Sequence, residues 1–199
     1  MLEIKWEQFI NYGLPLNNKL SSMTIGVFDG VHRGHQKLIN RIVSFNTDNV
    51  PIIVTFKDNY KTLNPDLNNK QQKNIYSFQE RLIMFEKLGI QITITIDFNE
   101  KIKHMPGIEF LDTLYRHGNI GFFAVGSNFR CGYQLDTDAA KIQQYFSSFN
   151  IPAETVPEVL YPEAGLEGSL PISSSRIRTA ISCGDTELAK KMLESTTPP

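Results

Sequence analysis

Apolar, β-branched runs alternate along this chain with stretches of helical spacing, and this alternation most constrains the fold. Residues 51–56 read Pro-Ile-Ile-Val-Thr-Phe without polar alternation, which is typical of a strand covered on both faces. Repeated strand–helix units of this length predict a single Rossmann-like α/β domain, a mostly parallel sheet with helices on both faces. Strands are predicted at residues 23–28, 51–56, 92–96, 120–125 and 153–159, and helices at 36–44, 77–89, 107–116, 138–149, 174–182 and 185–193.

The turn between the first strand and the first helix carries two histidines, in the sequence GVFDGVHRGH at residues 26–35. A glycine-containing turn of this kind brings backbone N–H groups and a helix N-terminus near the sheet edge, which suits phosphate. His32 and His35 are three residues apart, so both rings point from one face if the helix has begun by then. Imidazole, neutral or protonated, can donate hydrogen bonds to phosphate oxygens. Two surface histidines beside a helix cap are the alternative.

Three loops are predicted to meet at one edge of the sheet. Open parallel sheets bind ligands beyond the carboxyl ends of their strands. The histidine turn follows one strand, residues 56–59 follow a second, and residues 126–132 follow a third. This convergence depends on the topology alone. A polar, asparagine-rich stretch at residues 57–74 is predicted to be a long loop.

The segment ISSSRIR at residues 172–178 is the second motif. Serines before a helix are good N-caps and leave N–H groups that face outward. Arg176 is expected in the first helical turn, where a cation is mildly unfavourable against the helix dipole, and a bound anion would explain it. Ser174, Ser175 and Arg176 are therefore predicted to hold polyphosphate. The alternative is a capped surface helix with an exposed arginine.

Charge and cysteine content narrow the partners and the compartment. A net charge of −1 over 199 residues gives no broad basic field, which argues against nucleic acid as a partner. The 2 cysteines have no paired spacing, so neither a zinc site nor a disulfide framework is indicated, and a cytoplasmic location is expected. The sequence shows no leader segment and no apolar run of about 18 residues, so no membrane partner is expected. The length fits one domain, residues 1–199.

The histidine turn resembles the start of the nucleotidylyltransferase superfamily, and its form G-x-F-D-G-V-H-x-G-H looks like the adenylyltransferase module of bacterial FAD synthetases. That superfamily carries a segment similar to residues 172–178 opposite the histidines. The resemblance implies transfer of the adenylyl group of ATP to FMN, giving FAD and pyrophosphate, with Mg²⁺ on the triphosphate. It implies that His32, His35 and Arg176 are catalytic. The nucleotide-binding residues that it implies are Gly26, Val27, Phe28, Asp29, Gly34, Ser174, Ser175 and Arg176.

Asp29 either orients a metal-bound water or caps the turn, and we favour the cap. No residue is expected to be a direct metal ligand.

FAD synthetases also carry a G-x-x-F-R-F-G segment similar to residues 126–132, on the flavin side of the site. The resemblance implies flavin contacts at Asn128, Phe129 and Arg130, and at Thr55 and Phe56 after the second strand. Asn128 can alternatively serve only the turn, and Arg130 a structural ion pair. Cys131 replaces the usual aromatic residue and is expected to be a small buried residue rather than a reactive one.

Two departures from the family pattern keep alternatives open. FAD synthetases follow the second strand with a T-F-x-P-H-P-like segment, whereas residues 55–60 here lack both the proline and the histidine. The residues after 193 are too few for a riboflavin kinase domain, so neither that domain nor riboflavin phosphorylation is expected. The alternatives are a nucleotidylyltransferase with another phosphorylated acceptor and a catalytically weak flavin- or nucleotide-binding regulatory protein. The choice between ATP and CTP and the oligomeric state stay open.

Overall fold

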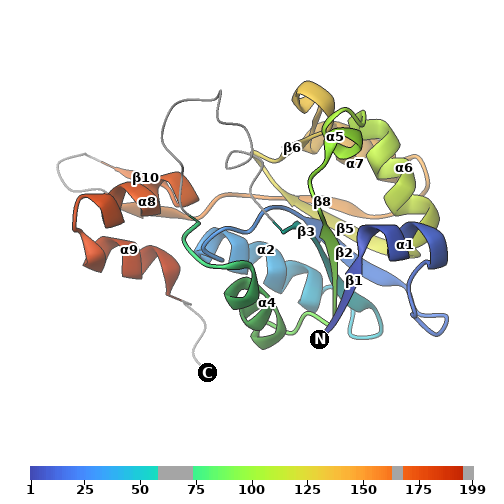
Figure 1. The fold of residues 1–199 in the computed structure, drawn as a ribbon, viewed down its shortest axis with the longest axis horizontal. Helices are drawn as coiled ribbons and strands as arrows, with labels where there is room; N and C mark the ends of the chain where they lie inside the picture. The colour runs from blue at the N-terminus through green and yellow to red at the C-terminus, as the bar shows by residue number, and fades with distance from the viewer. Residues whose placement is uncertain (58–73, 163–167, 195–199) are drawn as a thin grey trace.

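A six-stranded parallel sheet with helices on both faces forms the centre of the molecule (Figure 1). The structure is a computed structural model, and it describes residues 1–57, 74–162 and 168–194. All neighbouring strands of the sheet are parallel. Their order is β1 (Leu2–Lys5), β4 (Ile92–Ile96), β3 (Val50–Phe56), β2 (Ser21–Ile25), β5 (Ile120–Gly126) and β8 (Ala153–Val156). The predicted Rossmann-like α/β class is confirmed.

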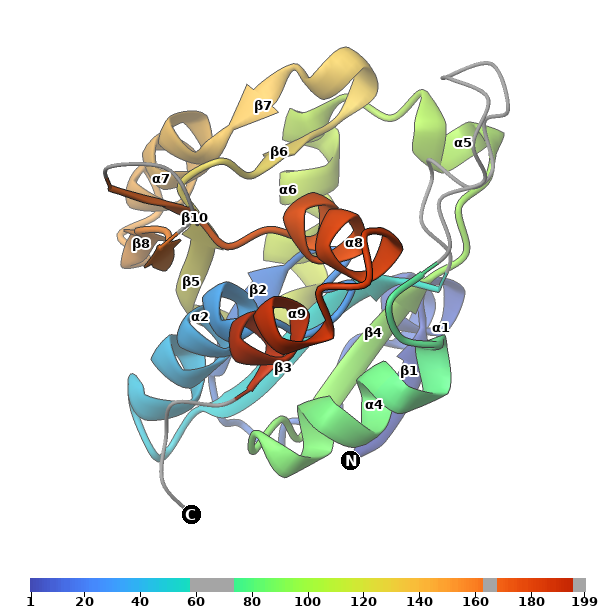
Figure 2. The ribbon, with the colours of Figure 1, turned by 90° about the vertical axis from the view of Figure 1, so that its left-hand side faces the viewer.

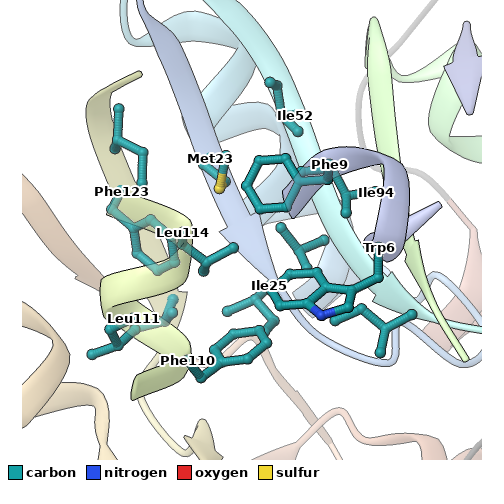
Figure 3. Packing of buried hydrophobic residues seen from close by; sticks show 14 of the residues in the cluster. Trp6, Phe9, Met23, Ile25, Ile52, Ile94, Phe110, Leu111, Leu114 and Phe123 are labelled. Atoms are coloured by element: carbon teal, nitrogen blue, oxygen red, sulfur yellow. The ribbon is translucent and has the colours of Figure 1, made fainter. Parts of the chain in front are cut away.

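Helices cover the two faces of the sheet with two separate apolar cores. One face carries α1 (Trp6–Tyr12), α6 (Gly107–Gly118) and α7 (Ala139–Ser147), and the other carries α2 (Arg33–Ser44) and α4 (Phe78–Lys87). Within β3, Ile52 and Val54 face the first core whereas Ile53 faces the second, which explains the continuous apolar run. In the first core Trp6 stacks on Phe110, with ring centroids 5.3 Å apart (Figure 3).

The C-terminal helices α8 (Ser174–Ser182) and α9 (Thr186–Leu193) pack on each other as a third apolar cluster. They lie together in front of the sheet in Figure 2. A small hairpin of β9 (Leu160–Pro162) and β10 (Ser169–Pro171) precedes α8. The remaining elements within the described residues are α5 (Glu100–Lys103), β6 (Arg130–Cys131), the 3₁₀ turn η1 (Tyr133–Leu135) and β7 (Thr137–Asp138).

Most predicted elements are present, with differences at their ends. The helix that follows Ser77 has the predicted capping box with Glu80. The first predicted strand ends at Ile25 rather than at residue 28, because the backbone of Phe28 turns to a left-handed φ of 53°. The strand expected at 153–159 likewise ends at Val156. The loop predicted at 57–74 lies mostly outside the described residues.

The N-terminal strand β1 and helix α1 were not predicted. In β1 only Ile4 is buried, and α1 spans 7 residues, so neither gives a strong periodic pattern. Among the helices in the described ranges, none combines the length and the apolar character that crossing a membrane requires.

Candidate active site at the carboxyl edge of the sheet

A cavity of about 460 Å³ opens where the loops after β2, β5 and β8 meet the N-terminus of α8. We call it the polar cavity, because its lining is more polar than that of the second cavity described below. The predicted convergence of the first and third loops at one edge of the sheet is therefore present. The cavity brings together most of the residues that the sequence singled out. These are Gly26, Val27, Phe28, Asp29, His32, Gly34, His35, Asn128, Phe129, Arg130, Ser174 and Ser175.

The backbone of the histidine turn is held in an uncommon conformation. Phe28, Gly30 and Val31 have φ angles of 53°, 82° and 38°. A positive φ suits glycine but is costly for a β-branched residue such as valine. Strain of this kind persists only where the surroundings fix the chain, and it is common at functional sites.

Asp29 anchors the turn to distant parts of the chain. One of its carboxylate oxygens accepts the backbone N–H of Ile75 at 2.9 Å, and the other forms an ion pair with Arg178. The backbone carbonyl of Asp29 accepts a hydrogen bond from Ser174 Oγ at 2.8 Å. The carboxylate therefore joins the turn to α8 and to the segment that precedes α4. It does not serve as the local cap that we favoured.

The two histidines stack on each other at the start of α2. Their ring centroids are 3.6 Å apart, and His32 Nδ1 accepts the backbone N–H of His35 at 3.4 Å as the helix cap. Because Nδ1 is the acceptor, a neutral His32 carries its proton on Nε2. The Phe28 ring lies edge-on to His35, with centroids 5.2 Å apart.

Both imidazoles are neutral at physiological pH. Burial lowers the pKa of His32 to about 4. Burial also lowers the pKa of His35 well below its usual range, and the neighbouring His32 and Arg81 lower it further. The buried Nδ1 of His35 has no hydrogen-bond partner among the described residues, and buried polar atoms normally have one.

The N-terminus of α8 faces the same cavity. Ser173 caps the helix by accepting the backbone N–H of Arg176 at 3.2 Å, and Ser174 and Ser175 line the cavity. The first N–H groups of a helix have no partner within the helix, and they favour an anion. The serine segment is therefore placed where the prediction of polyphosphate binding needs it.

Arg178, and not the predicted Arg176, lines the cavity. The guanidinium of Arg176 donates to three carbonyl oxygens of the β9–β10 hairpin at 2.9–3.0 Å, and Arg176 does not line the cavity. Arg178 lines it instead. Ser174 and Arg178 are four residues apart and share one face of α8, whereas Arg176 points away from that face. The four-residue spacing between Ser174 and Arg178 is the sequence signal that could have pointed to Arg178.

A second, apolar cavity of about 360 Å³ adjoins the first. The two cavities share Ile25, Val27, Phe129 and Arg130 in their walls. Sequence reasoning missed most of the apolar wall, which comes from separate loops and helices. The missed apolar side chains are Phe98, Ile102, Met105, Phe110, Tyr133 and Leu135.

The residues predicted on the flavin side divide between these cavities. Phe129 and Arg130 line both, and Phe56 lines the apolar one. Asn128 lines the polar cavity and donates to Glu158. Thr55 lines neither cavity, and its hydroxyl is 3.4 Å from the carbonyl oxygen of Val27.

Cys131 lies in the wall of the apolar cavity. Burial, followed by the charge of Asp136, raises the pKa of its thiol to about 12. The thiol therefore stays protonated and unreactive near neutral pH.

The comparisons with known proteins identify the family. The profile of the FAD synthetase family matches residues 15–175. The chain belongs to the FAD synthetase family. The resemblance noted in the sequence is thereby confirmed.

Curated relatives of the chain are bifunctional riboflavin kinase/FMN adenylyltransferases. The protein of Buchnera aphidicola subsp. Schizaphis graminum is 28% identical over 92% of this chain and 57% of its own length. The Bacillus subtilis protein is 29% identical over 87% of this chain and 53% of its own length. The chain thus spans about half the length of the curated relatives it matches.

Solved structures agree with the fold. A Streptococcus pneumoniae structure described as a macrolide-efflux protein superposes with a TM-score of 0.78 at 24% identity, over 98% of this chain and 60% of that one. Pantothenate synthetase from Thermus thermophilus superposes with a TM-score of 0.55 at 14% identity, over 97% of this chain and 71% of that one. At these identities the likeness concerns the fold alone.

The lowered pKa of His32 predicts how stability changes with pH. The folded pKa lies below the unfolded value, so the unfolded chain takes up the proton first. The free energy of unfolding should therefore fall as the pH drops from 6.5 towards 4, by up to roughly 1 kcal/mol per pH unit for each buried histidine. Urea unfolding at pH 7, 5.5 and 4.5 measures this slope.

His32→Asn separates the cap from the titration, because asparagine also caps helices well but does not ionise. The variant should show a shallower slope than the parent protein. Equal slopes in His32→Asn and the parent protein would contradict the assignment.

Gly132 is predicted to be essential for the wall of the apolar cavity. Its φ is +83°, and an added Cβ would lie 2.3 Å from the backbone nitrogen of Gly107. Gly132→Ala should lower the free energy of unfolding by about 2–4 kcal/mol, from backbone strain and overpacking together. Gly184→Ala is the matched control, since Gly184 has a φ of +77° with nothing within 4 Å of the added Cβ. Equal losses in urea unfolding would show that the steric contact is unimportant.

Proposed function

We propose that this chain catalyses transfer of the adenylyl group from ATP to FMN, giving FAD and pyrophosphate. The observation that carries the proposal is the pair of adjoining cavities, polar and apolar, with Val27 and Phe129 in their shared wall. One cavity suits a triphosphate and the other suits a planar aromatic ring. Membership of the FAD synthetase family supports this choice of substrates. The proposal takes residues 1–199 as one nucleotidylyltransferase unit.

In this proposal the polar cavity holds ATP. The backbone of Gly26 and Gly34 allows close approach of the nucleotide, and the N–H groups at the start of α8 face the phosphates. His32 and His35 act as neutral hydrogen-bond donors to the phosphate oxygens that gain charge in the transition state. Arg178, rather than Arg176, holds the leaving pyrophosphate. Its planar guanidinium can bond two phosphate oxygens at once.

The flavin ring of FMN occupies the apolar cavity. Aromatic side chains such as Phe98, Phe129 and Tyr133 supply broad faces and edges for a planar ring system. Arg130 lies in both walls, where its positive charge can meet the phosphate of FMN on its way into the polar cavity. The phosphate then meets the α-phosphorus of ATP where the two cavities adjoin.

The reaction requires no nucleophile from the protein. An oxygen of the FMN phosphate attacks the α-phosphorus of ATP, and the bond from that phosphorus to the oxygen bridging to the β-phosphorus breaks. Pyrophosphate leaves with that oxygen, and no proton need be removed because a phosphate monoester is largely ionised near neutral pH. The protein positions two anions and disperses charge.

Mg²⁺ enters as the MgATP complex. Among the described residues, no three His, Cys, Asp or Glu side chains gather as metal ligands, and both carboxylate oxygens of Asp29 already have partners. Mg²⁺ keeps several waters and binds substrate phosphates readily, so it needs few protein ligands.

Chromatographic detection of FAD tests the proposal. The protein with FMN, ATP and Mg²⁺ should form FAD, and riboflavin in place of FMN should give neither FMN nor a dinucleotide. CTP in place of ATP tests the nucleotide preference, and we expect ATP. No product from FMN, but adenylylation of another phosphorylated acceptor, would favour the broader transferase reading. Flavin binding without any turnover would favour the regulatory reading.

A further inference from the structure

Arg81 on α4 is a buried cation outside both cavities. Its side chain is the largest of the fully buried ones among the described residues, with 2% of its surface exposed. A buried guanidinium is costly unless hydrogen bonds replace its lost hydration. Its partners therefore show what it does.

The guanidinium of Arg81 spans the ends of two neighbouring strands. One of its nitrogens donates to the carbonyl oxygen of Val27 at 2.5 Å and to that of Phe56 at 3.2 Å. The other donates to Phe56 at 3.2 Å and to Lys57 at 2.7 Å. Val27 follows β2, Phe56 is the last residue of β3, and Lys57 follows it. The guanidinium therefore joins the backbones at the ends of two neighbouring parallel strands. A planar fork with several donors suits this geometry.

Both backbones lead directly into the proposed substrate sites. Val27 lies in the wall shared by the two cavities, and Phe56 lies in the wall of the apolar one. Phe28, the next residue after Val27, takes the left-handed backbone and places its ring against His35. Arg81 therefore contacts the backbone that leads into the histidine turn and the backbone of Phe56 in the wall of the apolar cavity.

We propose that Arg81 is a positioning residue, whose guanidinium fixes the polar and apolar cavities relative to each other by holding the carbonyl groups after β2 and β3. The kinetic part of this inference rests on the proposed function. Without the guanidinium each cavity keeps its own lining, but the two loops can shift against each other. The alignment of the FMN phosphate with the α-phosphorus then suffers more than the binding of either substrate.

Arg81→Met tests the kinetic consequence, because methionine fills much of the space but donates no hydrogen bond. We expect kcat for FAD formation to fall by about tenfold or more, while the Kd values of ATP alone and of FMN alone change by less than about threefold. Arg81→Lys keeps a cation but not the planar fork of donors. Its kcat should therefore lie between those of the parent protein and Arg81→Met.

Leu82→Ala is the matched control, because Leu82 is a buried core residue on the same helix that lines neither cavity. It should lower the thermal midpoint but leave kcat of the folded protein unchanged. Equal kcat values in Arg81→Met and Leu82→Ala would show that Arg81 is merely structural.

Hydrogen exchange supplies a readout that needs no catalysis. At temperatures well below unfolding, peptides that cover residues 26–31 and 52–57 should exchange faster in Arg81→Met than in Leu82→Ala. If the parent protein forms no FAD, the proposed function fails, while the exchange comparison still decides the role of Arg81. If Arg81→Met does not fold, Arg81→Lys takes its place. Equal exchange in the arginine variant and the control would overturn the proposal.

Discussion

Replacing His35 by alanine is expected to slow FAD formation by about 10²-fold or more, the usual cost of removing one preorganised donor to a transition-state oxyanion. The neutral ring is held between His32 and Phe28, and its Nδ1 has no hydrogen-bond partner among the described residues. A donor that is fixed before substrate arrives needs no reorganisation during the reaction. Steady-state kinetics with FMN and MgATP measure the loss, which should appear mainly in kcat.

Binding measurements separate this role from a structural one. The Kd of ATP in the absence of FMN should rise far less than kcat falls, since the donor acts most strongly on charge that develops in the transition state. His35→Asn keeps an N–H donor on a shorter side chain and should recover part of the rate. Near-normal turnover in His35→Ala would remove the histidine from the mechanism.

Replacing Arg178 by methionine is expected to slow turnover by about 10²-fold as well, because a cation that meets the leaving pyrophosphate is lost. Inhibition by added pyrophosphate should weaken in parallel, since the product binds the same guanidinium. Arg178→Lys keeps the charge opposite Asp29 but loses the planar fork, so it should recover only part of both effects. The inhibition constant for pyrophosphate and the thermal midpoint are measured together.

Arg176 provides the comparison within the same helix. Its guanidinium holds carbonyl groups of the β9–β10 hairpin, so Arg176→Lys should lower the thermal midpoint but change pyrophosphate inhibition by less than about threefold. The reverse result, with pyrophosphate inhibition lost in Arg176→Lys and kept in Arg178→Met, would restore the prediction made from the sequence.

Features encoded in short stretches could be predicted from the sequence. The apolar run at 51–56 predicted a strand covered on both faces, and β3 has Ile52 and Ile53 in different cores. The histidine spacing predicted two rings on one side if the helix had begun by His32. The helix begins at Arg33 with His32 as its cap, and the two rings stack on each other. In both cases the residues that decide the structure are neighbours in the chain.

Features that depend on distant contacts could not be predicted in the same way. The apolar cavity is assembled from Phe98, Phe110, Tyr133 and others on separate elements, and no periodic pattern joins them. Asp29 was read as a cap, but its partners Ile75 and Arg178 lie 46 and 149 residues away. Arg176 was predicted from the motif alone, and the helical spacing that places Arg178 with Ser174 in the cavity wall was not considered.

The fate of labelled oxygen tests the central claim most directly. FMN whose terminal phosphate oxygens carry ¹⁸O is incubated with unlabelled MgATP and the protein, and both products are analysed by mass spectrometry. Attack of the FMN phosphate on the α-phosphorus predicts that all the label is found in FAD and none in pyrophosphate. Release of AMP together with a pyrophosphorylated flavin, or label in pyrophosphate, would contradict the account.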